Sequence, residues 1–163
     1  MWWSEARVVA VGLAALLLAG CGFHLQGAHA LPEGVKNVHV STTDELTPFA
    51  VELRRALERS GARVAPSSAG ADAVIRIRQD RTGRRVLSVS ARNTPQEFEV
   101  YYSVEFAIDR GGQEALAPQQ LDLTRYFSFD ESLLLAKDRE EASLREAMAR
   151  DLADLVLRQL GSL

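Results

Sequence analysis

The sequence predicts an α+β fold, a two-layer α/β sandwich in which a mostly antiparallel sheet of about four strands carries two helices packed on one face. Two kinds of pattern predict this class. Residues 97–109 alternate strictly between apolar and polar side chains, as in a half-buried strand. Residues 47–60 and 138–159 repeat apolar side chains at helical spacing. Because two helices cover only one face of a sheet, we expect the other face to meet solvent or a partner.

The first part of the domain is expected to hold one strand and one helix. Residues 36–42 alternate, with two valines on one face. Thr47 and Pro48 predict the start of a helix, because threonine caps the first turn and proline lacks an N–H that this turn leaves unpaired anyway. The helix should run over 47–60 and end before Gly61.

Two further strand segments should follow. Residues 72–80 and 85–92 alternate, and Thr82 with Gly83 is expected to turn the chain between them. Pro95 cannot donate to a strand ladder, so the second segment should end before it.

The alternating segment 97–109 leads into a glycine-rich hairpin turn at 110–113. The returning strand is expected at 121–129, where Arg125 interrupts an otherwise apolar face. Residues 130–137 should form a short helical turn or a loop.

The last helix is expected over 138–159. Asp138 would cap it, and Glu141 three residues later completes a capping-box pattern. Its predicted buried stripe is Leu144, Met148, Leu152, Leu155 and Leu160.

The N-terminus has the pattern of a bacterial lipoprotein. An apolar run at 8–18 ends in Leu-Ala-Gly-Cys21, which resembles a lipobox, where the cysteine is acylated and becomes the first residue of the mature protein. As a helix this run would cover roughly 17 Å, short of the roughly 30 Å hydrocarbon core. We expect a signal peptide at 1–20, a lipidated lead-in at 21–34 and a single domain at 35–163. The glycine after Cys21 favours the outer membrane, because aspartate there would resemble an inner-membrane retention signal.

Composition and motifs argue against catalysis. The net charge of −3 argues against a nucleic-acid partner. The spacing of His24, His29 and His39 matches no zinc pattern, and the sequence has neither a phosphate-binding glycine loop nor a Gly-x-Ser-x-Gly elbow. The sequence therefore predicts a protein that is not an enzyme and uses no metal or cofactor.

Residues 76–92 carry six arginines against one acidic residue, Asp80. Arginine binds phosphate and carboxylate groups in bidentate fashion, so one interpretation is a site for an anionic partner such as a phosphorylated lipid. The other interpretation is a hairpin whose arginines are solvated. The sequence leaves both open.

Two short motifs connect these features to a known family. Cys21 is followed by Gly-Phe-His-Leu25 and Gly27, and Leu135-Ala-Lys-Asp138 stands before the last helix. With the order of the elements, they resemble the LPS-assembly lipoproteins of the LptE family over the whole mature chain. The resemblance implies a lipid-anchored outer-membrane protein that sits as a plug inside the lumen of the β-barrel LptD. It would help the barrel assemble and take part in delivering lipopolysaccharide to the outer leaflet.

The resemblance also implies site residues. Family residues tied to lipopolysaccharide binding lie near the turn after the third strand and in the Ala-Lys-Asp stretch, and by position they fall on Arg92 and Lys137 here. Charge clustering adds Arg84 and Arg85 as candidates. The alternative is a free-standing outer-membrane lipoprotein that binds or senses an anionic lipid without a barrel partner.

Overall fold

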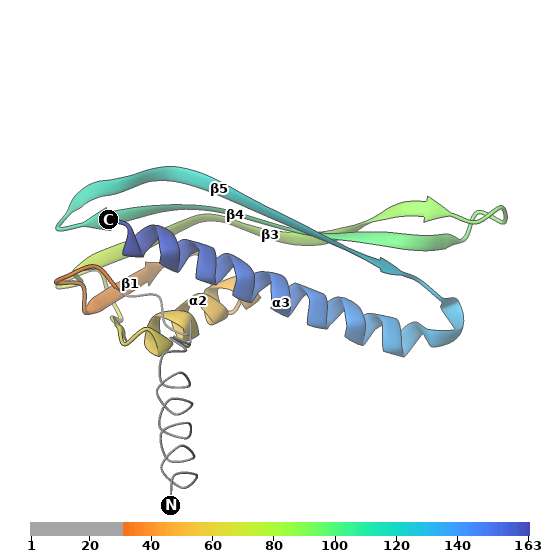
Figure 1. The fold of residues 1–163 in the computed structure, drawn as a ribbon, viewed down its shortest axis with the longest axis horizontal. Helices are drawn as coiled ribbons and strands as arrows, with labels where there is room; N and C mark the ends of the chain where they lie inside the picture. The colour runs from red at the N-terminus through yellow and green to blue at the C-terminus, as the bar shows by residue number, and fades with distance from the viewer. Residues whose placement is uncertain (1–30) are drawn as a thin grey trace, which may run out of the picture.

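The computed structural model describes residues 31–163, which form a mixed five-stranded sheet with two helices against one of its faces (Figure 1). The predicted α+β class is confirmed. The elements in chain order are β1 (Asn37–Ser41), α2 (Pro48–Arg59), β2 (Arg63–Val64), β3 (Ala73–Val89), β4 (Pro95–Arg110), β5 (Gln113–Ser128), a 3₁₀ turn η1 (Glu131–Leu133) and α3 (Leu134–Gly161). The expected signal peptide and Cys21 lie outside the described residues.

The sheet has the strand order β2-β1-β3-β4-β5. β1 pairs in parallel with both β2 and β3, whereas β3, β4 and β5 form an antiparallel meander. The strand that the sequence did not predict is β2, which is two residues long. It lies beside β1 because α2 forms the crossover that a parallel pair requires.

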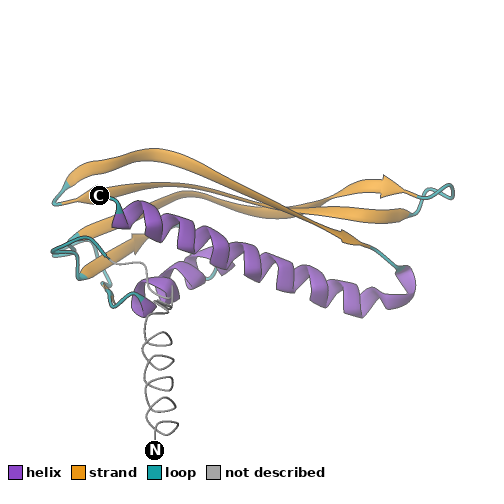
Figure 2. Cartoon of the chain, viewed as in Figure 1, coloured by secondary structure: helices purple, strands orange, loops and turns teal. Residues whose placement is uncertain are grey.

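The meander is much longer than the rest of the sheet. β3 has 17 residues and β4 and β5 have 16 each, so the strands extend for roughly 50 Å. The turn between β3 and β4 reaches past the first turn of α3 (Figure 2). We call this end of the molecule, residues 84–100 and 127–137, the distal end.

The start of α2 confirms the predicted cap. The Thr47 side chain accepts a hydrogen bond of 3.2 Å from the Ala50 N–H, and Pro48 occupies the first helical position. The Phe49 N–H donates to the Tyr102 hydroxyl of β4 at 3.1 Å. Gly61 follows the helix in the left-handed region, with a φ of 86°.

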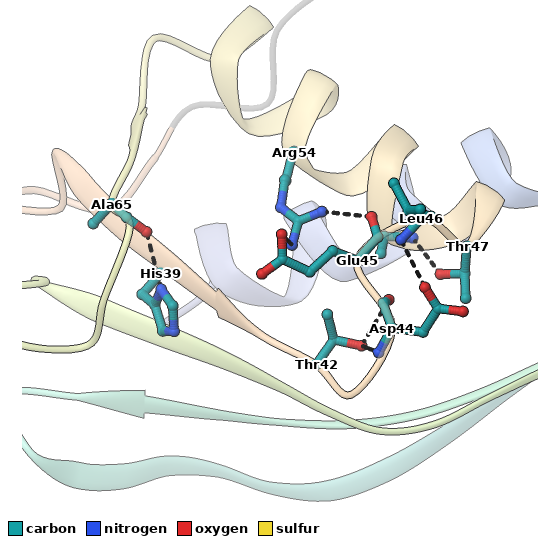
Figure 3. Close-up of polar contacts among 9 residues, drawn as sticks. His39, Thr42, Asp44, Glu45, Leu46, Thr47, Arg54 and Ala65 are labelled. Carbon is teal, nitrogen blue, oxygen red and sulfur yellow. Dashed lines mark hydrogen bonds and ion pairs between the residues drawn. The ribbon is translucent and has the colours of Figure 1, made fainter.

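Side-chain hydrogen bonds order the loop before α2 (Figure 3). The Leu46 N–H donates to the Asp44 carboxylate at 2.9 Å, and the Arg54 guanidinium donates to the Glu45 carbonyl at 2.8 Å. Leu46 itself is 85% exposed. The loop therefore has a defined backbone although its apolar side chain has no partner in the described chain.

The predicted turn at Thr82 and Gly83 is wrong, because β3 runs without a break through both residues. Gly83 pairs with Tyr101 of β4. A Cβ atom at position 83 would lie 2.5 Å from the Tyr101 hydroxyl oxygen, so the tyrosine occupies the space that any side chain at 83 would fill. The glycine therefore admits a cross-strand aromatic side chain and does not turn the chain.

The predicted hairpin at 110–113 is confirmed. Gly111 and Gly112 have φ values of 58° and 79°, which a two-residue turn with positive φ at both central positions requires. β5 begins directly after it, eight residues earlier than expected. Most of residues 113–120 are exposed, so this edge segment lacks the alternation that reveals a half-buried strand.

The predicted start of the last helix is also wrong. α3 begins at Leu134, so Asp138 lies inside the helix and caps nothing. The turn before it is capped instead by Asp130, whose carboxylate accepts hydrogen bonds from the Ser132 N–H at 2.9 Å and hydroxyl at 2.7 Å. Glu141 is a buried residue of the helix interior.

The core lies between the sheet and the two helices. The predicted stripe of α3 is partly confirmed: Met148, Leu152 and Leu160 are buried, whereas Leu144 and Leu155 are half-buried. The alternating apolar residues of β4 contribute Phe98, Val100, Tyr102, Val104, Phe106 and Ile108.

The other face of the sheet is uncovered and polar. Its arginines form cross-strand ion pairs with acidic residues of β4 and β5. The pairs are Arg76 with Asp109 and Glu114, Arg78 with Glu105, and Arg85 with Glu99. This face therefore carries charge in compensated form.

Candidate functional site

The four basic candidates lie at the distal end but do not form one cluster. Arg84 and Arg85 are neighbours on β3, where successive side chains point to opposite faces of the sheet. Arg92 lies in the β3–β4 turn, and Lys137 lies in the first turn of α3. The four basic side chains therefore have different neighbours.

Arg84 lies on the helix-covered face and joins β3 to α3. Its guanidinium donates a hydrogen bond of 2.6 Å to the Glu141 carboxylate, which is 6% exposed. The same carboxylate forms an ion pair with Arg145 one turn further along α3. The Arg84 guanidinium also lies 4.9 Å from the centre of the Phe98 ring, within cation–π range. These contacts give Arg84 a structural role.

Arg85 lies on the uncovered face, where it pairs with Glu99 at 2.5 Å. Glu99 is 5% exposed, so a buried carboxylate depends on this arginine for charge compensation. An anion that bound Arg85 would compete with Glu99. The structure thus gives both candidates that came from charge clustering an internal acidic partner.

Arg92 is different, because it is exposed and no described carboxylate lies within 4.0 Å of it. The turn that carries it is well ordered. The Ser90 hydroxyl accepts hydrogen bonds of 3.2 Å from the N–H groups of Arg92 and Thr94, and the Ser90 N–H donates to the Thr94 carbonyl at 2.8 Å. Asn93 supplies the positive φ, 60°, that closes the turn. The guanidinium is thus held at the tip on a defined backbone.

Lys137 forms a 2.8 Å ion pair with Glu140, three residues along the same helix. Hydrogen bonds from the Ser132 side chain and backbone lower the pKa of Asp130, and the charge of Lys137 adds a smaller effect in the same direction. The Lys137 side chain is only 15% exposed, so its ammonium group is less accessible than the Arg92 guanidinium.

Most arginines of the basic stretch, residues 76–92, have an acidic partner within the protein. Arg76, Arg78, Arg84 and Arg85 are partly exposed but pair with acidic residues that are distant in sequence, so an anion would have to compete with a carboxylate for each of them. Arg81 and Arg92 have no carboxylate within 4.0 Å among the described side chains.

The distal end also exposes apolar side chains that the sequence patterns did not predict. Val86, Leu87 and Val89 of β3 are each about half exposed, at 49%, 53% and 51%. Leu133, Leu134 and Leu135 at the start of α3 are also exposed. The sequence feature that could have indicated this surface is the run of three leucines at 133–135, because three consecutive residues cannot all lie on one face of a helix.

The described residues hold no sign of a metal centre. No group of three or more His, Cys, Asp or Glu side chains in this part of the chain is placed to hold an ion. His39 lies on β1, and its Nδ1 is 2.9 Å from the Ala65 carbonyl oxygen (Figure 3). His24 and His29 lie outside the described residues. Within 31–163, no helix is both long and apolar enough to cross a membrane.

Comparison with known proteins identifies the family. The sequence model described as LptE, lipopolysaccharide-assembly, matches residues 35–160. The chain belongs to the LptE family. An LPS-assembly lipoprotein LptE from Pectobacterium atrosepticum is 24% identical over 151 residues, covering 92% of this chain and 82% of the relative. One from Yersinia pestis is 26% identical over 151 residues, covering 92% of this chain and 72% of the relative.

Solved structures of LptE-like lipoproteins have the same fold. Lipoprotein B from Nitrosomonas europaea superposes with a TM-score of 0.72 at 29% identity, covering 86% of this chain and 91% of that chain. The rare lipoprotein B from Shewanella oneidensis gives a TM-score of 0.67 at 27% identity, covering 78% and 95%. A minor lipoprotein from Acinetobacter baumannii, 21% identical with a TM-score of 0.63, is similar in fold.

Proposed function

We propose that this protein is a lipid-anchored outer-membrane lipoprotein that plugs the β-barrel LptD, helps it assemble and takes part in delivering lipopolysaccharide to the outer leaflet. The observation that carries the proposal is the match of residues 35–160 to the LptE family of lipopolysaccharide-assembly proteins. Relatives that align with nearly the whole chain are named LPS-assembly lipoproteins. The lipobox-like motif that ends in Cys21 supports the anchor.

The uncovered face of the sheet supports the barrel partner. A barrel lumen is lined by polar residues, and the cross-strand ion pairs of this face present compensated charges. Tyr101 and Tyr126 add exposed aromatic side chains there, a residue type that is enriched in protein interfaces. A polar face with a few aromatic anchors suits a partner that is itself polar.

The distal end supports a lipopolysaccharide contact. Arg92 presents a guanidinium without a described acidic partner, and Lys137 adds a second positive charge that pairs with the half-exposed Glu140. Charge-assisted hydrogen bonds from such groups to phosphates are stronger than neutral ones. The role is one of binding that loosens packed lipid, and no covalent bond is made or broken.

The barrel partnership is tested by co-purification. The chain is tagged at its C-terminus, outer membranes are extracted in mild detergent, and stoichiometric partners are identified by mass spectrometry. We expect a single large β-barrel, about one per lipoprotein. A lipoprotein that comes out of the outer membrane alone would instead favour the free-standing lipid-binding alternative.

Lipopolysaccharide binding is tested with Arg92→Glu combined with Lys137→Glu. The matched control is Arg63→Glu combined with Arg150→Glu, two exposed basic residues outside the distal end. We expect both proteins to fold, and only the first to bind purified lipopolysaccharide more weakly, by about tenfold or more, because two attractions become repulsions. Equal binding by the two variants would remove Arg92 and Lys137 from the site.

A further inference from the structure

Two exposed tyrosines are neighbours on the uncovered face of the sheet. Tyr101 of β4 pairs with Thr124 of β5, and Tyr126 follows two residues later on the same face of β5. Such diagonal neighbours on an antiparallel pair are about 7–8 Å apart, within reach of aromatic side chains. Tyr101 is 38% exposed and Tyr126 is 61% exposed, and no other aromatic residue within 31–163 is exposed.

Gly83 gives the Tyr101 side chain its place. A Cβ atom at position 83 would lie 2.5 Å from the tyrosine hydroxyl oxygen and 2.7 Å from the ring carbon that carries it. The ring therefore reaches across to β3, close to the backbone, and glycine leaves this space open. A side chain already held in this way has little conformational freedom left to lose when a partner binds.

An aspartate lies on the other side of Thr124. Asp122 is exposed and precedes Thr124 by two residues on the same face of β5, so Thr124 has Tyr126 and Asp122 on its two sides and Tyr101 across from it. Side-chain hydrogen bonds, the largest contribution coming from Ser103, hold the pKa of Asp122 below its ordinary value. The carboxylate is therefore negatively charged at neutral pH.

Asp122 differs from the other carboxylate beside the tyrosines. Glu99, which pairs with Tyr126 across the two strands, is buried and compensated by Arg85. Asp122 has no basic group within 4.0 Å among the described side chains. In its own row of the sheet the nearest arginine is Arg81, two strands away at roughly 10 Å. The fold thus leaves the charge of Asp122 without a partner in the described part of the chain.

An arginine side chain matches this arrangement. A guanidinium placed over Thr124 would lie against the tyrosine rings, since cations are attracted to aromatic faces within about 6 Å of the ring centre. The same group would donate two parallel hydrogen bonds to the Asp122 carboxylate. Lysine lacks the planar fork, and a neutral side chain would leave the carboxylate charge uncompensated. A polar barrel lumen is a surface that can carry such an arginine.

We propose that Tyr101, Asp122 and Tyr126, which we call the tyrosine patch, bind an arginine side chain from the wall of the barrel partner. The inference rests on the proposed function and deepens it, because it names the residues that make the contact and the chemistry of the group they bind. The tyrosines supply aromatic surface, and the aspartate sets the charge that the partner must carry. Tyrosine and arginine are among the residues that most often dominate the binding energy of an interface.

The test uses the full-length lipoprotein in complex with its barrel, captured in mild detergent through the C-terminal tag. The yield of the complex and the half-life of the barrel on the resin are measured for the native chain, for Tyr101→Ala with Tyr126→Ala, and for Asp122→Asn. Glu58→Gln is the matched control for charge. Glu58 is exposed, has no described basic group within 4.0 Å and lies on α2, on the opposite side of the sheet. Circular dichroism checks that each variant is folded.

We expect Glu58→Gln to behave like the native chain. The double tyrosine variant should shorten the half-life by about tenfold or more, since the loss of interface anchors acts mainly on the dissociation rate. Asp122→Asn should shorten it by about threefold or more, and its difference from the native chain should shrink in high salt. Tyr101→Phe with Tyr126→Phe should keep most of the half-life, because phenylalanine retains the aromatic face.

A photocrosslink identifies the bound group. p-Benzoylphenylalanine replaces Tyr126, the complex is irradiated in outer membranes, and the crosslinked barrel peptide is identified by mass spectrometry. We expect this peptide to contain an arginine whose replacement by glutamine shortens the half-life of the native complex. In the Asp122→Asn background the same replacement should have little further effect, because the interaction is already lost.

Three results would overturn the proposal. A native chain that comes out of the outer membrane without a barrel would reject the proposed function together with this inference. A barrel that stays equally long on the native chain and on the double tyrosine variant would keep the proposed function and place the contact elsewhere. A crosslinked peptide without an arginine, or additive effects of the two charge-removing substitutions, would reject arginine as the bound group.

Discussion

Arg84 of β3 and Glu141 of α3 are 57 residues apart in the chain and form a hydrogen bond of 2.6 Å. The carboxylate is buried, and the guanidinium also lies 4.9 Å from the centre of the Phe98 ring. This contact joins the sheet to the first half of α3. It is a long-range link between β3 and α3 at the start of the distal end.

Removal of Arg84 should destabilise the protein more than removal of Arg92. Arg84→Ala leaves the buried Glu141 with Arg145 as its partner, and we expect a loss of about 2–3 kcal/mol in the free energy of unfolding. Arg92→Ala is the control and should change the urea midpoint little, because Arg92 has no described carboxylate within 4.0 Å. Equal midpoints for the two variants would show that the Arg84–Glu141 contact contributes no net stability.

Gly83 and Tyr101 should be energetically coupled. Gly83→Ala places a Cβ atom where the Tyr101 hydroxyl lies, so the ring must move and we expect a cost of about 1 kcal/mol. In a Tyr101→Ala background the same substitution should be neutral or stabilising, since alanine suits a strand better than glycine. A double-mutant cycle by urea unfolding measures this coupling, and additive effects would contradict it.

The Tyr102 hydroxyl should stabilise the start of α2. Tyr102→Phe leaves the buried Phe49 N–H without its acceptor, and we expect a loss of about 1–3 kcal/mol in unfolding free energy. Tyr126→Phe on the uncovered face is the control, because its side chain is exposed. Burial, with Asp80 as the second cause, raises the pKa of Tyr102 well above its usual value, so the hydroxyl keeps its proton in the folded state at neutral pH.

Asp72 should make stability depend on pH in the acid range. Its carboxylate accepts hydrogen bonds from the Asn37 N–H at 2.7 Å and the Lys36 N–H at 2.9 Å, which lower its pKa below 3.8. Since the folded-state pKa is below that of the unfolded chain, this contribution is complete above the unfolded pKa and is lost as the pH falls through the folded one. Asp72→Asn should therefore lower the urea midpoint at pH 7, and the difference should shrink below about pH 4. An NMR titration that finds an ordinary pKa for Asp72 would contradict this.

The elements that the sequence predicted correctly depend on neighbours along the chain. α2 is determined by Thr47, Pro48 and its apolar spacing, and β4 by strict alternation against one buried layer. The hairpin at Gly111 and Gly112 requires two positive φ angles, which glycine supplies locally. Such signals need no knowledge of the tertiary structure.

The errors have non-local causes. Gly83 indicated a turn, and only the position of Tyr101 on the neighbouring strand shows that the glycine lies within a strand. Glu141 fitted a capping box, but in the fold its carboxylate meets Arg84 and Arg145. The arginines of residues 76–92 suggested an anion site, while most of their acidic partners lie on other strands or on α3.

The sequence by itself determined the class of fold, the two helices, the hairpin at 110–113 and the resemblance to the LptE family, because helix caps, glycine turns and apolar periodicity act over a few residues. Only the tertiary structure decided which arginines are compensated and where apolar surface stays exposed. A charge is compensated by whichever carboxylate the fold brings within reach, and a leucine is buried only if another element covers it. That is why the tertiary structure separates Arg92 from Arg84 and Arg85, and why it shows exposed apolar side chains at the distal end.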